Sequence, residues 1–255
     1  MFSWFKKPST TGPSAVERLK VDIHSHLIPG IDDGAKTLEE SLTLVKAMVE
    51  MGYEKLILTP HVMRDVYRNT PERILEGLAQ LQEAVTQAGI NVILEASAEY
   101  YLDEGFLKIL ETESVLPIAG KYLLFETSYM AKPNNMFDLI YAIKLHGYTP
   151  ILAHPERYRY IKAPEEEYQA LRAMDVLFQI DMTSWGGHYG KDAKTKAEFL
   201  LQKGWVDLVG SDVHKMRHIN NLQSVLDDRT LWKRVWEKNS PGNIALLDSV
   251  QEATE

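Results

Sequence analysis

Short apolar segments alternate with amphipathic segments along most of the chain. Seven apolar runs end in polar or turn residues, and they span residues 21–26, 55–61, 91–97, 121–126, 149–154, 176–181 and 205–212. Each run is too short for an ordinary helix and is apolar on both faces, which is typical of parallel strands that are covered on both sides. The pattern therefore predicts seven parallel strands.

Segments with helical periodicity separate these runs. In the clearest of these helical segments, Thr37 and Glu40 form a capping box and Gly52 ends the helix. Pro71 opens the next helix, which ends before Gly89. Further helices are expected at about 103–111, 135–146, 191–203 and 220–250, the last with a polar interruption at 239–243. One more helix begins near residue 164. This alternation predicts an α/β protein, and a closed barrel explains it best.

Residues that can bind metals follow the predicted strands. In a parallel barrel the carboxyl ends of the strands share one rim, where active sites lie. His24 and His26 are one residue apart, so in an extended backbone both imidazoles point to the same side. The other strand ends bring His61, Glu99, Glu126, His154, Asp181, Asp212 and His214. Each residue alone also fits an ordinary loop position, but the recurrence favours a metal site that performs hydrolysis.

Composition narrows the class of protein. The 255 residues suit one large domain, and we expect a flexible N-terminal extension over residues 1–19 and a single barrel domain over 20–255. The chain has no cysteine, which excludes thiolate ligands and favours a reducing compartment, the cytoplasm. A net charge of -8 disfavours nucleic acid as a partner. No apolar run is long enough to span a membrane.

The motifs resemble those of one known superfamily. V-D-I-H-S-H, T-P-H, A-E-Y-Y, F-E, A-H-P-E-R-Y and S-D-V-H occur in the order found in the polymerase and histidinol phosphatase (PHP) superfamily. The combination H-S-H-L-x-P-G-x-D-D-G with A-H-P-E-R-Y resembles its bacterial protein-tyrosine phosphatase branch, which is associated with capsule and exopolysaccharide production. The resemblance covers roughly residues 20 to 250. It implies a distorted (β/α)7 TIM-like barrel that holds three divalent ions (Mn, Fe or Zn) at the C-terminal rim of the strands.

The resemblance also implies roles for individual residues. The first ion would take His24, His26, Glu99 and Asp212, the second Glu99, Glu126 and His154, and the third Asp33, His61 and His214. Glu99 would bridge the first two ions. Arg157 resembles the family's phosphate-gripping arginine, and Arg217 is a second candidate whose spacing after S-D-V-H departs from the family pattern. Asp181 matches no ligand of the family, so we expect it beside the ligands or lining the barrel.

The expected activity follows from this resemblance and from the residues. We expect a metal-dependent protein-tyrosine phosphatase that uses metal-activated water, since no cysteine is present to form a phosphocysteine. Its substrate would be the tyrosine-rich tail of a bacterial tyrosine kinase that controls capsule or exopolysaccharide synthesis. Two alternatives stay open: a histidinol-phosphatase-like small-molecule phosphomonoesterase, and a non-catalytic metal-binding regulator. Rim aromatics such as Tyr129 could line a phosphotyrosyl site or simply pack.

Overall fold

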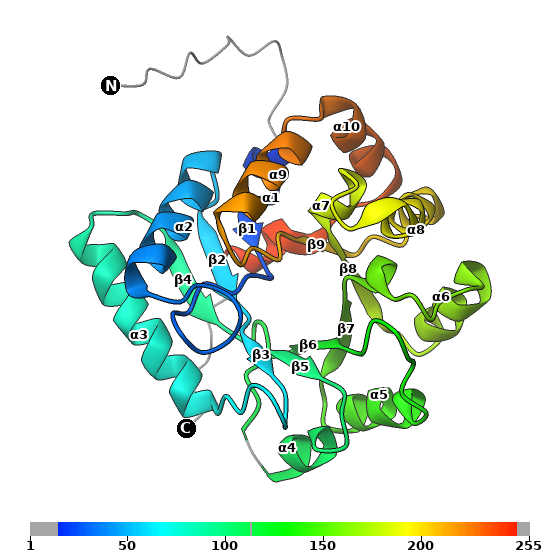
Figure 1. The fold of residues 1–255 in the computed structure, drawn as a ribbon. Coiled ribbons are helices and arrows are strands. Elements are labelled where there is room, and N and C mark those ends of the chain that lie inside the picture. The colour runs from blue at the N-terminus through cyan, green and yellow to red at the C-terminus, as the bar shows by residue number, and fades with distance from the viewer. Residues whose placement is uncertain (1–14, 113, 249–255) are drawn as a thin grey trace.

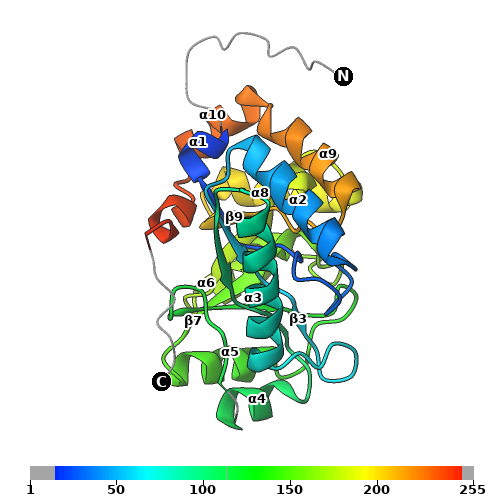
Figure 2. The ribbon, with the colours of Figure 1, turned by 90° about the vertical axis from the view of Figure 1, so that its left-hand side faces the viewer.

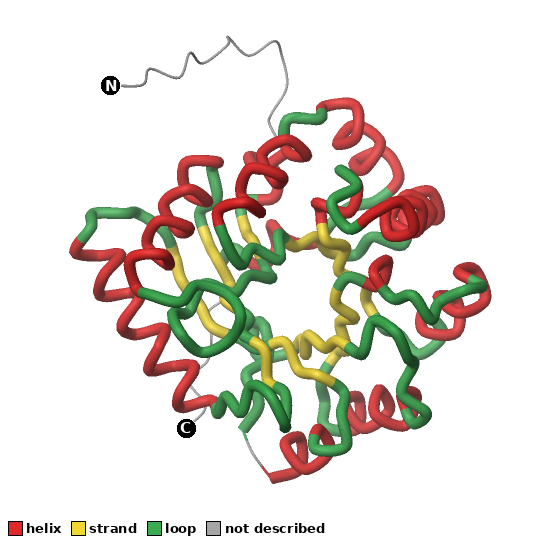
Figure 3. Tube along the Cα trace, in the orientation of Figure 1, coloured by secondary structure: helices red, strands yellow, loops and turns green. Residues whose placement is uncertain are grey.

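The computed structural model describes residues 15–112 and 114–248, which form a ring of parallel strands surrounded by helices (Figures 1 and 3). The strands are β1 (Val21–Asp22), β2 (Lys55–Leu58), β3 (His61–Val62), β4 (Ile93–Ala96), β5 (Glu99–Tyr101), β6 (Tyr122–Glu126), β7 (Thr149–Ala153), β8 (Leu177–Asp181) and β9 (Leu208–Gly210). Every pairing between these strands is parallel. The predicted α/β barrel class is confirmed.

The ring has seven strand positions, although two of them are broken. The strands pair in the orders β1-β2-β4 and β3-β5-β6-β7-β8-β9. Because β2 and β3 follow each other in the chain, as do β4 and β5, the two sheets continue into one another. A parallel bridge between Ser25 and Val213 joins the segment after β1 to the segment after β9 and closes the ring. The predicted run 55–61 is interrupted at Pro60, whose nitrogen has no proton for a sheet hydrogen bond.

Helices cover the outside of the ring. They are α1 (Ala15–Leu19), α2 (Leu38–Met51), α3 (Pro71–Gln87), α4 (Phe106–Thr112), α5 (Met136–Leu145), α6 (Pro164–Arg172), α7 (Met182–Trp185), α8 (Gly190–Lys203), α9 (Met216–Leu226) and α10 (Arg229–Lys238), with two 3-10 helices, η1 (Pro155–Arg157) and η2 (Gly242–Leu246). Thr37 caps α2 as predicted, since its hydroxyl accepts a hydrogen bond from the Glu40 amide. Figure 2 shows α3 running along the side of the barrel.

Two features differ from the sequence predictions at the chain ends. Residues 15–19, which we assigned to a flexible extension, form α1, and Val16 and Leu19 are buried in the core. Residues 15–19 therefore pack with the barrel, and residues 1–14 lie outside the described part of the chain. In the predicted helical segment 220–250, the expected interruption at 239–243 separates α10 from η2, and a further break that was not predicted separates α9 from α10. In the described residues, no helix is long and apolar enough to cross a membrane.

The barrel interior is apolar in its middle and polar at the C-terminal rim of the strands. A buried cluster includes Ile57, Leu124, Ile151 and Leu208, all on or beside the strands of the ring. Side chains two residues apart on a strand point to the same face. On β6, Glu126 follows Leu124 by two residues, so it shares that face and lies at the carboxyl end of the strand. This alternation places carboxylates and imidazoles above an apolar floor.

Candidate metal centre

All nine predicted metal ligands lie together at the C-terminal rim of the barrel. They come from the segments after β1, β7 and β9, from the first residues of β3 and β5, from the last residue of β6, and from the loop before α2. Their donor atoms form four overlapping groups: His24, His26 and Asp212; His24, Glu99 and His154; His61, Glu99 and Glu126; and His26, Asp33, His61 and His214. The fold thus gathers in one place residues that are up to 190 positions apart in sequence (214 − 24).

The predicted first ligand set has the spacing of a coordination shell. Nε2 of His24 lies 3.2 Å from Nε2 of His26, 3.3 Å from Glu99 Oε2 and 3.4 Å from Asp212 Oδ1. Nε2 of His26 lies 3.5 Å from Glu99 Oε2 and 3.3 Å from Asp212 Oδ1. Four ligands placed about 2.1 Å from an ion at the corners of a tetrahedron are about 3.4 Å apart. His24, His26 and Asp212 share one donor group at this spacing, whereas Glu99 belongs to the group with His24 and His154 and to the group with His61 and Glu126.

Glu99 connects this set to its neighbours through both carboxylate oxygens. Oε1 lies 2.9 Å from His154 Nε2, and Oε2 lies 3.0 Å from His61 Nδ1. Glu126 Oε1 is 3.0 Å from the same His61 nitrogen, whereas Glu126 Oε2 is 3.9 Å from His154 Nε2. His61 thus lies closer to Glu126 than His154 does, a contact that the predicted ligand sets did not include.

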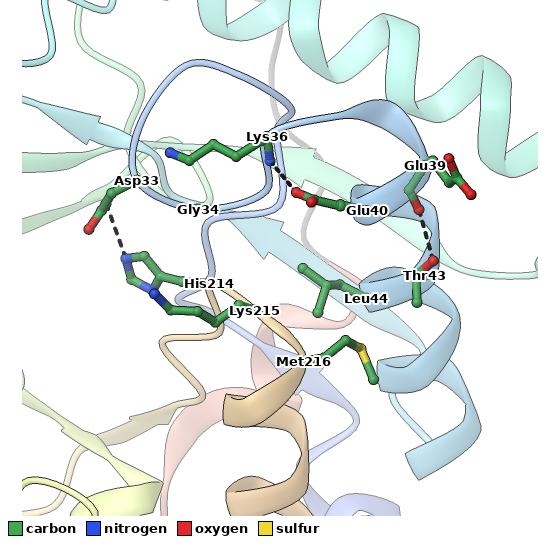
Figure 4. A pocket seen from close by; sticks show the side chains of 10 residues that line it. All are labelled: Asp33, Gly34, Lys36, Glu39, Glu40, Thr43, Leu44, His214, Lys215 and Met216. Carbon is green, nitrogen blue, oxygen red and sulfur yellow. Dashed lines mark hydrogen bonds and ion pairs between the residues drawn. The ribbon is translucent and has the colours of Figure 1, made fainter.

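The third predicted set lies at the open side of the centre. Asp33 Oδ1 lies 3.5 Å from His61 Nε2 and 3.4 Å from His214 Nε2. Figure 4 shows Asp33 and His214 pointing toward one another beside a cavity of about 500 Å³. The Asp33 side chain is 54% exposed, whereas those of His24, His26 and Glu99 are completely buried. Solvent therefore reaches the cluster from the Asp33 end.

Two buried side chains orient the first pair of histidines. Nδ1 of His26 lies 2.7 Å from Asp32 Oδ2, and Nδ1 of His24 lies 2.8 Å from Gln179 Oε1. With Nδ1 engaged in this way, each ring turns Nε2 toward the cluster, an arrangement typical of metal-binding histidines. Gly210 makes the second contact possible, because a Cβ there would lie 2.5 Å from Gln179 Nε2 and 2.7 Å from His24 Cβ.

Buried polar atoms without hydrogen bonds support the metal assignment. Glu99 Oε2 and His61 Nδ1 are both buried and make no hydrogen bond, although they lie 3.0 Å apart. Leaving such groups unpaired costs free energy unless another partner satisfies them. His154 and Asp212 also adopt positive backbone φ angles of 34° and 48°, which are uncommon for residues other than glycine and cluster at functional sites. A divalent cation fits this donor set.

The charges in the cluster also favour a bound cation. Burial opposes the protonated form of His24, but the carboxylates of Glu99 and Asp212 outweigh it and raise its pKa to about 10. Burial also opposes protonation of His26, and Asp32 leads the groups that raise its pKa to about 9. Burial and the positive charge of Arg157 instead lower the pKa of His154 to about 4. The carboxylates thus attract positive charge to the centre, which a bound cation would supply in place of protons.

Arg157 extends from η1 over the edge of the cluster. It donates a hydrogen bond to Asp212 Oδ2 and lies 3.6 Å from Asp181 Oδ2. Its guanidinium lies 4.0 Å from the ring centre of Tyr189 and 4.8 Å from that of Tyr129, so aromatic rings hold it in place. Asp181 belongs to none of the four donor groups and contacts Arg157, which agrees with the supporting position expected for it.

One more candidate, Arg217, is exposed on the first turn of α9, and its charge contributes, after burial, to a lowered pKa of His188. Gln179 and Tyr189 were not selected from the sequence, and Asp32 was not among the predicted ligands. Signals for two of these residues were nevertheless present: Asp32 is half of a carboxylate pair, and Gln179 interrupts an apolar strand.

A parallel barrel with clustered imidazoles and carboxylates at its rim defines a class, the barrel proteins that bind metal at the C-terminal rim of their strands. Within that class, residues 20–226 match the family described as capsular polysaccharide synthesis, CpsB/CapC. The chain belongs to this family.

Individual relatives agree with this assignment. The chain is 30% identical over 201 residues to tyrosine-protein phosphatase YwqE of Bacillus subtilis, covering 78% of this chain and 79% of the relative. It is 27% identical over 202 residues to tyrosine-protein phosphatase CpsB of Streptococcus pneumoniae, covering 77% and 83%.

Solved structures place the fold in the same group. A structure from work on YwqE of Bacillus subtilis and CpsB of Streptococcus pneumoniae, described as unique metal-dependent tyrosine phosphatases, matches with a TM-score of 0.78 and 27% identity. The match covers 90% of this chain and 94% of the other. The lactonase Lmo2620 of Listeria monocytogenes matches with a TM-score of 0.51 and 12% identity over 91% of each chain, which shows the fold alone.

Proposed function

We propose that this chain is a metal-dependent protein-tyrosine phosphatase. The observation that carries the proposal is a cluster of nine metal-competent side chains, buried except at the Asp33 end, that contacts Arg157 through Asp212. The guanidinium of Arg157 also packs against two tyrosine rings. Support comes from YwqE and CpsB, both named tyrosine-protein phosphatases. The complete donor set also argues against a regulator that has lost its activity.

The nine side chains would hold three divalent ions, of manganese, iron or zinc. His24, His26, Glu99 and Asp212 would bind the first, Glu99, Glu126 and His154 the second, and Asp33, His61 and His214 the third. Bound ions supply two things here: they lower the pKa of water toward about 7 and they stabilise negative charge on a transferring phosphoryl group. The protein's own task is to keep the donors in place, and Asp32 and Gln179 do so for His26 and His24.

Arg157 would grip the phosphate. Its planar guanidinium can donate two parallel hydrogen bonds to phosphate oxygens, which a lysine cannot do. Asp212 and Asp181 fix the guanidinium on one side, and the rings of Tyr129 and Tyr189 restrict its rotation. Those rings also provide apolar surface beside the phosphate position, where the phenyl ring of phosphotyrosine would pack. Arg217 would provide a second positive charge for the substrate from α9.

The physiological substrate we propose is the phosphorylated tyrosine-rich tail of a bacterial tyrosine kinase that controls capsule or exopolysaccharide synthesis. This part of the proposal rests on the family, whose description is capsular polysaccharide synthesis. We place the reaction in the cytoplasm, and the absence of cysteine is compatible with that compartment.

One comparison of substrates tests the activity. Purified protein is loaded with manganese, iron or zinc in separate samples, and its kcat/KM is measured for a phosphotyrosyl peptide, a matched phosphoseryl peptide and histidinol phosphate. We expect the phosphotyrosyl peptide to be preferred. Preference for histidinol phosphate would support the small-molecule alternative instead, and absence of turnover with all metals would support a regulator. Mass spectrometry of the metals in the active sample tests the number and identity of the ions.

A further inference from the structure

A basic groove continues outward from Arg157. Its cavity has a volume of about 730 Å³ and is lined by the 129–130 loop, the segment after η1, and the start of α8. Arg157 lines this cavity and also contacts Asp212 in the metal cluster. The groove therefore begins at the position where the phosphate of the substrate would bind.

Three further cations line the groove: Arg159, Lys162 and Lys191. All three residues are exposed, and none of their side chains makes an ion pair with any residue in the ranges 15–112 and 114–248. Together with Arg157 they place four cations around one cavity on a chain whose net charge is -8. Because the cations repel one another, the arrangement calls for an anionic partner.

Nearby carboxylates are already engaged elsewhere. Asp192 lines the groove, but its Oδ2 lies 2.7 Å from the buried Lys196 ammonium, which neutralises it. Of the acidic residues on the first turn of α6, Glu165 pairs with Lys203, and Glu167 accepts hydrogen bonds from the backbone amides of residues 162 and 163. None of the acidic residues of that turn lines the cavity. Of the charged residues that line the cavity, four are cations, Arg157, Arg159, Lys162 and Lys191, and one is a carboxylate, Asp192.

The backbone connects the groove to the site. The amide of Arg159 donates a hydrogen bond of 2.7 Å to the carbonyl of Tyr129, which joins two walls of the groove. The rings of Tyr129 and Tyr189 hold Arg157 on the side where the two regions meet. A polypeptide whose phosphotyrosine reached Arg157 would thus have its neighbouring residues beside the three cations.

We propose that this groove binds a second anionic side chain of the polypeptide substrate and so selects phosphotyrosines with negatively charged neighbours. The inference rests on the proposed phosphatase function and deepens it. The second anion would be either a carboxylate of aspartate or glutamate or the phosphate of another phosphotyrosine. Both would pair with Arg159, Lys162 and Lys191 in the same way, and the experiment distinguishes them.

The test compares three phosphotyrosyl peptides of equal length, with neutral flanks, with glutamates as flanks, and with a second phosphotyrosine. Steady-state kinetics are measured for the wild type and for the triple variant R159Q/K162Q/K191Q. Exposed ion pairs each contribute roughly 1.5- to 5-fold, so we expect the wild type to favour an anionic peptide through a KM about tenfold lower. The variant loses this preference but keeps its kcat and its turnover of para-nitrophenyl phosphate.

A matched variant controls for net charge. K46Q/R73Q/K233Q removes three exposed cations from α2, α3 and α10, away from the cavity lining, and should keep the preference. Figure 1 shows α2 and α3 across the barrel from α6 and α8. The preference of the wild type for anionic peptides should also fall as salt is raised from 0.1 M to about 1 M, because the Debye length at 1 M is only about 3 Å.

Each outcome has a defined meaning. Preference for the glutamate peptide or for the doubly phosphorylated peptide supports the groove and identifies the anion. Equal KM values for all three peptides, or a preference that survives in R159Q/K162Q/K191Q, would overturn it. If the wild type hydrolysed no phosphotyrosyl peptide, the proposed function would fail; fluorescence anisotropy with the same peptides would still measure the groove, and equal binding by all of them would overturn it independently.

Discussion

Asp32 provides a sharp test of the metal centre, because it supports a ligand without belonging to any donor group. Its Oδ2 accepts from His26 Nδ1 at 2.7 Å and from the His61 amide at 3.2 Å, and its Oδ1 accepts from the Gly34 amide at 2.9 Å. Although burial opposes its ionisation, His26 lowers the pKa of Asp32, so it is charged at neutral pH. Asp32→Asn keeps the shape but removes the charge and turns one acceptor into a donor.

The size of the effect follows from these contacts. An asparagine has one oxygen, so it cannot accept on both sides as Asp32 does, and its NH₂ group would face either the Gly34 amide or His26. A hydrogen bond to a charged group contributes about 1.5–3 kcal/mol. Loss of such support at a metal-binding histidine lowers metal affinity by about 10- to 100-fold. We therefore expect D32N to fold normally and to bind metal with an affinity about 10- to 100-fold lower than that of the wild type.

The assay is a titration in metal-buffered solution with bound metal measured by mass spectrometry and hydrolysis measured in parallel. D65N, which removes an exposed carboxylate, is the control and should match the wild type. Circular dichroism checks that D32N is folded. A folded D32N protein with wild-type affinity at every free metal concentration would refute the reasoning that Asp32 orients His26.

Three other changes test further parts of the site. R157K should keep the wild-type metal content but lose about 100-fold in kcat/KM, since lysine lacks the planar fork; unchanged kinetics would contradict the role of Arg157. Removal of metal by a chelator should abolish hydrolysis and lower Tm by about 5–10 °C, because an ion at about 100 times its Kd stabilises only the folded state, by about 2.7 kcal/mol; calorimetry with and without added manganese measures this shift, and an unchanged Tm would argue against the buried cluster as the metal site. Gly210→Ala would place a methyl group 2.5 Å from Gln179 Nε2, and we expect a loss of about 1–3 kcal/mol in denaturant unfolding. Gly242→Ala, whose added Cβ would have its nearest neighbours at 3.7 Å, should unfold like the wild type, and equal losses in both variants would remove the case for crowding at Gly210.

The order of elements was readable because local patterns determine it. Thr37 and Gly52 delimit α2 as the capping pattern predicted, and the apolar runs mark the strand positions of the ring. The breaks within strands were missed. The run 55–61 was predicted as one strand by its hydrophobicity, although Pro60 lies within it, and the structure divides it into β2 and β3. The break between β4 and β5 has no such local signal, because it depends on how all the strands close together, which no single segment specifies.

The chain's own sequence determined which residues can bind metal and where on the fold they belong. Strand periodicity predicted that His24, Glu126 and His154 lie at strand ends, because parallel strands bring their carboxyl ends to one rim, whereas Asp33 entered the predicted ligand set only through the family resemblance. Only the tertiary structure decided how these donors divide into groups, that Asp32 and Gln179 orient the histidines, and that Arg157 opens into a basic groove. The physical reason is that distances of a few ångströms between side chains from different strands depend on barrel closure and packing, whereas the sequence pattern records only each strand's own alternation.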